Sequence, residues 1–173
     1  AVNALKNRKL DFEKRKYDLY FSGITKNPFL QHILSERKKD LRVRIQNFIF
    51  YNYKGINFFK KKKYKNYKIF WNAFTGNKLT DKFKNIIGQY KLYDEEDYFN
   101  NYFQSKVVLS TLSPADIISP RYFETMISGA MCLCEESDLY KDILVPYENY
   151  IPFRKDLSDF HEKFKLCIES NEI

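Results

Sequence analysis

The chain has 173 residues, which is long enough for one α/β domain with a core of its own. Hydrophobic residues make up 44% of it, and 16 Phe, 14 Tyr and 1 Trp exclude wholesale disorder. No apolar run approaches the roughly 18 residues that span a bilayer, and the start of the chain lacks the apolar centre of a secretory signal. Three cysteines are too few for a disulfide scaffold, which favours a reducing, cytoplasmic location.

The net charge of +8 is unevenly distributed. Residues 1–91 hold 23 Lys and Arg against 6 Asp and Glu, and residues 92–173 hold 7 against 16. A basic half of this kind suits an anionic membrane surface, nucleic acid or an acidic acceptor. The run KKKKYKNYK at 60–68 interleaves bases with aromatics, as nucleic-acid binders do. No recognised nucleic-acid-binding motif surrounds this run, so we interpret it as a charged surface loop in a basic insertion near 52–68.

The first half of the chain alternates apolar runs with helical segments. Residues 1–16 are interpreted as a basic helix or linker, and residues 17–173 as one domain. We predict strands at three apolar runs: 17–21, 41–50 and 67–71. We predict helices at two segments: 27–39 and 79–87. Ser22 and Gly23 are expected to end the first strand.

The rest of the chain continues the same alternation. Helical segments are predicted at 94–104, 119–129, 137–144 and 157–167, and strands at 88–93, 107–112, 131–134 and 150–153. Ser119 can cap the second of these helices, Pro120 suits its first position, and Gly129 can end it. A strand, a helix and a strand in succession form a βαβ unit, whose strands lie parallel. The sequence therefore predicts an α/β fold, a Rossmann-like parallel sheet flanked by helices.

The start of the helix at 119–129 has the chemistry of an anion site. Free backbone N–H groups and the positive end of the helix dipole face the preceding loop. Arg121 in the first turn is unfavourable for the helix alone, but it suits a bound phosphate. Glu124 shares a face with Arg121 and could accept hydrogen bonds from ribose or sugar hydroxyls. An ordinary ion pair between the two side chains explains the spacing equally well.

The run SPRYFETMISGAMCL at 119–133 resembles the donor-site motif of group 1 glycosyltransferases, in particular the spore-maturation-protein-like branch. The run at 142–164 is also similar to the end of protein O-glucosyltransferase-like enzymes. Together the resemblances cover residues 17–170, and the specific part is 119–135. They imply the C-terminal, nucleotide-sugar-binding half of a GT-B fold.

The resemblance also implies roles for individual residues. Arg121 and the helix start at Ser119 and Pro120 would take the diphosphate, and Glu124 would take the ribose hydroxyls. Asp116, eight positions before Glu124, would lie near the transferred sugar. Here Ile117, Ile118 and Ser119 replace the family's usual Gly-Phe-Gly, a departure that bears on this role of Asp116.

Two further segments enter through the same resemblance. Ser22 and Gly23 would line the diphosphate side of the cleft, with a plain turn as the alternative. The loop that begins at Gln89 and Tyr90 would hold the base through backbone groups. The chain has no D-x-D, Walker A or H-E-x-x-H motif, and we expect neither a metal nor another cofactor.

The expected function is that of a glycosyltransferase donor domain. It would bind a nucleoside-diphosphate sugar and pass the sugar, without a metal, to an unknown glycan, lipid or protein acceptor. The acceptor domain would precede Ala1, so the chain alone would be inactive. The alternatives are a basic α/β module that docks on nucleic acid or anionic membrane, and a degenerate transferase domain that binds without turnover. We expect a cytoplasmic protein whose basic half contacts a membrane surface.

Overall fold

A computed structural model describes residues 11–24, 41–54, 64, 67–74, 95–112 and 118–169. They divide into two compact units. The first unit holds the described residues among 1–21, 68–70 and 92–173. The second unit holds those among 22–67 and 71–91. No helix in the described part of the chain is long and apolar enough to cross a membrane.

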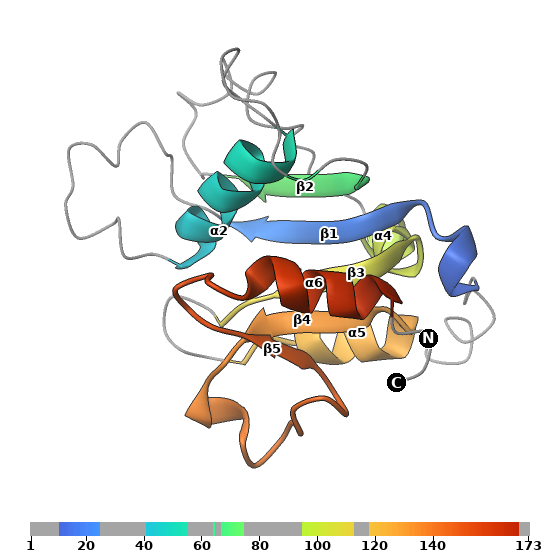
Figure 1. The fold of residues 1–173 in the computed structure, drawn as a ribbon. Helices are drawn as coiled ribbons and strands as arrows, with labels where there is room; N and C mark the ends of the chain where they lie inside the picture. Colours follow the sequence, from blue (N-terminus) through green and yellow to red (C-terminus); the bar gives the residue numbers. More distant parts are fainter. Residues whose placement is uncertain are drawn as a thin grey trace. The chain divides into compact units, whose positions relative to one another are not determined.

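A parallel β-sheet forms the centre of the first unit (Figure 1). Within the described residues its order is β2-β1-β3-β4-β5. The strands are β1 (Tyr17–Ile24), β2 (Ile69–Phe74), β3 (Ser105–Ser110), β4 (Met131–Glu135) and β5 (Ile151–Phe153). The pairs β1·β3, β3·β4 and β4·β5 are parallel, with Leu19 opposite Val107 and Leu133 opposite Ile151. The predicted α/β fold class with a parallel, Rossmann-like sheet is confirmed.

Helices cover both faces of this sheet in the first unit (Figure 1). The helices α4 (Glu95–Phe103) and α5 (Arg121–Ser128) lie on one face, and α6 (Phe160–Glu169) lies on the other. On α4, the Tyr102 ring meets the Tyr20 ring edge-on at 5.4 Å. On the far side, the Phe160 ring meets Phe153 at 5.1 Å. Because both faces are covered, β3 is buried at every position except Lys106, and its centre is the apolar run Val107–Leu109.

The ends of α5 follow the sequence signals in part. Gly129 ends the helix with φ of 70°, a left-handed conformation that glycine adopts without steric strain. At the other end the N-cap position is Pro120, and no side chain caps the helix. The predicted serine cap is wrong, because the Ser119 hydroxyl makes no hydrogen bond within the described residues and gives the helix no cap. The final helix, α6, begins at Phe160, later than predicted, because Leu157 takes a left-handed turn with φ of 67°.

The segment predicted as a strand at 41–50 is a helix. It forms α2 (Leu41–Ile49) and continues as the π-helical turn η4 (Phe50–Lys54). Arg42 and Gln46 are buried on it beside the apolar positions. Together with the buried apolar residues, these two polar residues form one buried stripe of a helix. The apolar residues alone alternate as they would in a strand, which explains the wrong prediction. Gln46 accepts a hydrogen bond of 3.2 Å from the Trp71 indole, which explains its burial.

Two other expectations need correction or fall outside the described residues. Ser22 and Gly23 do not end the first strand, because both are buried inside β1, which runs on to Ile24. The plain turn considered for Gly23 is therefore excluded. The predicted elements at 27–39, 79–87 and 88–93 lie outside the described residues, as does the lysine run at 60–63. The proposed domain bounds stay predictions.

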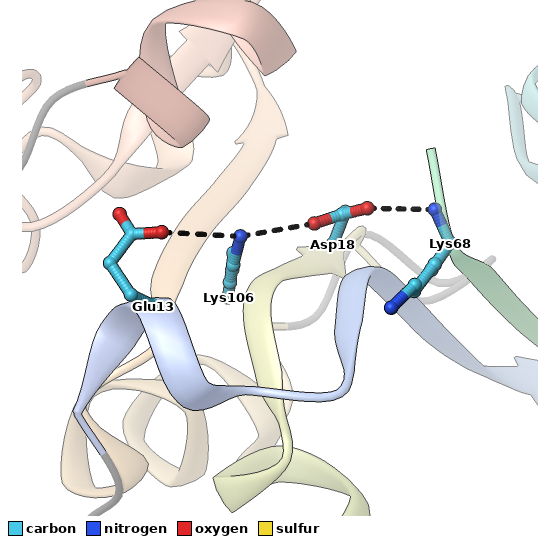
Figure 2. Close-up of polar contacts among 4 residues, drawn as sticks. All are labelled: Glu13, Asp18, Lys68 and Lys106. Atoms are coloured by element: carbon cyan, nitrogen blue, oxygen red, sulfur yellow. Dashed lines mark hydrogen bonds and ion pairs between the residues drawn. The ribbon is translucent and has the colours of Figure 1, made fainter. Parts of the chain in front are cut away.

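Charged side chains join the amino ends of three strands (Figure 2). Asp18 accepts a hydrogen bond of 2.7 Å from the Lys68 backbone amide, and its other oxygen lies 3.3 Å from Lys106 Nζ. Glu13 lies 3.8 Å from the same ammonium. These residues stand at the starts of β1, β2 and β3, at the sheet edge opposite the carboxyl ends. A substitution of Asp18 would therefore weaken contacts at the amino ends of the strands, away from their carboxyl ends.

Candidate functional site

The carboxyl edge of the parallel sheet is the natural place for a ligand in this fold. Open α/β sheets bind ligands in the crevice outside the carboxyl ends of their strands. Here β3 ends at Ser110, and the chain returns to the sheet through α5, which begins at Arg121. The amino end of α5 therefore lies at the carboxyl edge of β3 and β4 (Figure 1).

Arg121 is the first residue of α5, and two nitrogens of its guanidinium are left without acceptors by the described part of the chain. Its Nε and Nη1 atoms are buried and have no hydrogen-bond partner among the described residues. The Ser119 hydroxyl, two residues earlier, is likewise buried without a partner in that part of the chain. Buried donors of this kind cost free energy unless an acceptor meets them, and for a charged group the loss is larger. The start of α5 thus presents unsatisfied donors that suit an anion.

Glu124 is held by a tyrosine of α4 and not by Arg121. Its Oε2 accepts a hydrogen bond of 2.8 Å from the Tyr98 hydroxyl. The Tyr98 hydroxyl also lies 2.8 Å from that of Tyr102. Arg121 and Glu124, both among the described residues, form no ion pair with each other. The ordinary ion pair that the spacing of Arg121 and Glu124 allowed is therefore not formed between them.

The surroundings of the Tyr98 and Tyr102 hydroxyls shift the pKa values of both groups. Burial raises the pKa of the Tyr98 hydroxyl, and the Glu124 carboxylate raises it further. Burial likewise raises the pKa of the Tyr102 hydroxyl. The positive charge of Arg121 lowers the pKa of both hydroxyls in part. Both tyrosines are protonated at neutral pH and available as hydrogen-bond donors.

Glu135 is a second carboxyl group at the same edge, at the end of β4. It is buried, and its Oε1 accepts a hydrogen bond of 2.9 Å from the Leu112 amide. Its Oε2 has no hydrogen-bond partner in the described part of the chain. Burial raises the pKa of this carboxyl, and the Leu112 amide, the Lys155 charge and the Tyr140 hydroxyl offset part of the rise. Glu135 thus holds the backbone at Leu112, just after β3 ends at Ser110.

The raised pKa of Glu135 predicts a specific pH dependence of stability. The folded chain holds this proton more tightly than the unfolded chain, whose carboxyl has the ordinary value of 4.5. As the pH rises from 4.5 toward the raised folded value, the free energy of unfolding therefore falls, by about 1.4 kcal/mol per unit of pKa shift. Glu135→Gln keeps an acceptor for the Leu112 amide and should remove this fall.

Urea unfolding of the wild type and Glu135→Gln across pH 4 to 8 measures the effect. The two free energies of unfolding should converge at the acid end and separate as the pH rises, with the variant the more stable. Parallel curves would show that Glu135 titrates alike in the folded and unfolded chain.

The structure brings together four of the residues predicted from sequence: Ser119, Pro120, Arg121 and Glu124 lie at the start of α5. Ser22 and Gly23 lie at the carboxyl end of β1, in the second unit. Asp116, Gln89 and Tyr90 lie outside the described residues. The roles assigned to all of these residues stay predictions. No group of three or more potential metal ligands occurs among the described residues.

Sequence reasoning missed Tyr98 and Glu135. Tyr98 lies in the helical segment predicted at 94–104, and its contact with Glu124 appears only when α4 packs against α5. Glu135 follows the buried run Met131–Cys134, and an acid at the carboxyl end of a parallel strand was a usable signal.

The fold and this cluster together define a Rossmann-like α/β domain with a candidate anion site at its carboxyl edge. The sequence model of the family described as "Glycosyl transferase-like" matches residues 61–172, which is well over half of the chain. The chain belongs to this family, and the resemblance to glycosyltransferases is confirmed. The match spans α5 and the whole Arg121–Glu124 cluster, and it supports a transferase. A search of curated proteins found no match.

Proposed function

We propose that this chain is the donor-binding domain of a GT-B glycosyltransferase and binds a nucleoside-diphosphate sugar at the carboxyl edge of the sheet. The observation that carries the proposal is the pair of buried guanidinium nitrogens of Arg121, Nε and Nη1, which have no partner among the described residues at the start of α5. A diphosphate is an anion that would satisfy both the guanidinium and the helix start. The family match spans this position, which supports the same reading.

The cluster divides naturally between two parts of the donor. Arg121 and the helix start at Ser119 and Pro120 would bind the diphosphate. The Glu124 carboxylate has one oxygen on Tyr98, and its Oε1 has no partner within the described residues. That oxygen would accept hydrogen bonds from the ribose hydroxyls. Asp116 would contact the sugar.

The contacts expected around the rest of the donor follow from the family resemblance. Ser22 and Gly23 would border the diphosphate, and the loop that begins at Gln89 and Tyr90 would hold the base. The donor would need no metal, because Arg121 supplies the positive charge.

Sugar transfer needs stabilisation of the departing nucleoside diphosphate. The bond between the anomeric carbon and the phosphate oxygen breaks, and a hydroxyl oxygen of the acceptor forms the new bond to that carbon. The acceptor proton passes to a base, and the electron pair of the broken bond stays on the phosphate oxygen. Arg121 would stabilise this growing negative charge. The acceptor would be a glycan, lipid or protein. Another domain would bind it and supply the base.

A salt titration separates this proposal from a basic module that binds polyanions. Binding of the chain to UDP, GDP and a single-stranded oligonucleotide would be measured by calorimetry from about 50 to about 200 mM salt. UDP or GDP should bind with a modest salt dependence, because few phosphate charges are involved. A protein that neutralises many phosphates loses about 10³-fold or more over this range. Tight, steeply salt-dependent oligonucleotide binding with no UDP or GDP binding would contradict the proposal.

A further inference from the structure

We propose that Tyr98, supported by Tyr102, is a positioning residue that holds the Glu124 carboxylate in place for recognition of the donor's ribose. This inference rests on the donor-binding function proposed above. It adds to the site a residue from α4, a helix that carries none of the predicted donor contacts. The argument begins from the hydrogen bonds that link the three side chains.

The direction of these hydrogen bonds follows from the number of protons. An ionised carboxylate only accepts, so the Tyr98 hydroxyl must donate its single proton to Glu124 Oε2 across 2.8 Å. The Tyr102 hydroxyl lies 2.8 Å from the Tyr98 oxygen and therefore donates to it. The chain of donation runs from Tyr102 through Tyr98 to Glu124. It ends on a carboxylate oxygen, which makes the last bond a charge-assisted one.

Packing fixes the tyrosine end of this chain. The Tyr102 side chain is fully buried, and its ring meets the Tyr20 ring edge-on at 5.4 Å. The Tyr98 ring lies 5.0 Å from the Tyr102 ring. Glutamate has three rotatable bonds and loses considerable freedom when it is fixed. Because Tyr98 is itself held, Glu124 is oriented before any ligand arrives, which favours binding.

The same contact keeps Arg121 available. Glu124 lies three residues after Arg121 on one helix face, where an ion pair between them is the ordinary arrangement. Tyr98 instead occupies one oxygen of Glu124, and the guanidinium keeps two buried donor atoms that no described residue contacts by a hydrogen bond. The arrangement separates an anion-binding cation from a hydroxyl-binding carboxylate one helical turn away. A diphosphate and its attached ribose carry these two kinds of group side by side.

The test compares the full chain with its Tyr98→Phe variant, which removes one hydroxyl and keeps the ring. Calorimetry would measure the affinities for UDP and 2′-deoxy-UDP, or for the guanosine pair if GDP binds more tightly. We expect Tyr98→Phe to weaken the ribonucleotide by about 3- to 10-fold, the range for one lost hydrogen bond, and the deoxynucleotide by less than about twofold. The preference for ribose should therefore fall. Tyr102→Phe should lower it in the same direction by a smaller factor.

Tyr140→Phe is the matched control. It removes a hydroxyl from another buried tyrosine pair, Tyr122 with Tyr140 at 2.6 Å, which does not contact Glu124. Its ribose preference should equal that of the wild type. An unchanged preference in both Tyr98→Phe and Tyr102→Phe, with the wild type preferring ribose, would overturn this inference alone. A wild type that binds no nucleoside diphosphate would overturn the inference together with the proposed function.

Discussion

Arg121→Ala is expected to weaken the binding of UDP, GDP and the intact donor alike by about 10- to 150-fold, the value of a charge-assisted contact of about 1.5–3 kcal/mol. The loss should be uniform because every such ligand contains the diphosphate. The folded chain should not lose stability, since two buried donor atoms of the guanidinium meet no acceptor among the residues that the structure describes. Arg121→Lys should recover only part of the affinity, because an ammonium lacks the planar fork of the guanidinium.

Two controls accompany this variant. Lys165→Ala removes an exposed cation from α6, on the other face of the sheet, and tests for a general effect of charge. Asp18→Asn weakens the charged contacts at the amino ends of the strands and tests for a general effect of stability (Figure 2). Both should bind UDP and GDP like the wild type. If Arg121→Ala also binds like the wild type, Arg121 has no part in donor binding.

Glu124→Gln is expected to weaken the ribonucleotides by about 5- to 10-fold and to affect their 2′-deoxy counterparts by less than about twofold. The amide keeps the shape of the side chain and an acceptor for Tyr98, but it loses the charge that strengthens bonds from ribose hydroxyls. A deoxynucleotide has already lost one of those bonds. Calorimetric titration of the variant with both kinds of nucleotide measures the difference.

The two variants should differ in which nucleotides they bind more weakly, as well as in how much affinity they lose. Arg121→Ala should reduce the affinities for ribo- and deoxyribonucleotides by the same factor, and Glu124→Gln should not. Equal losses for both nucleotides in Glu124→Gln would mean that Glu124 acts through the diphosphate or the fold. The ribose assignment would then be wrong, and the diphosphate assignment would stand.

The β3-α5-β4 unit could be predicted because its local signals agree with its packing. The unit begins with a buried β-branched run, proline stands at the helix start, and Gly129 has the left-handed conformation that ends a helix. The four residues at the start of α5 follow directly from that assignment. Their mutual proximity needed only the spacing along one helix.

Other features could not be predicted, because they depend on contacts between distant segments. The buried Arg42 and Gln46 made a helix look like a strand, and the partner that explains Gln46 is Trp71, 25 residues away. Tyr98 and Glu124 are 26 residues apart. Glu135 meets the Leu112 amide across 23 residues. Local patterns carry no information about such pairs, so these partners of Gln46, Glu124 and Glu135 could be found only in the folded chain.

The most direct test of the proposed donor site is a map of nucleoside-diphosphate binding on the whole chain. The ¹⁵N-labelled protein would be titrated with UDP and with GDP, and the backbone amide shifts would be followed to saturation. The largest changes should fall at the start of α5, over residues 118–124, and at the end of β3, over 110–112. Changes confined to the basic insertion near 52–68, or no saturable change with either nucleotide, would contradict the proposal.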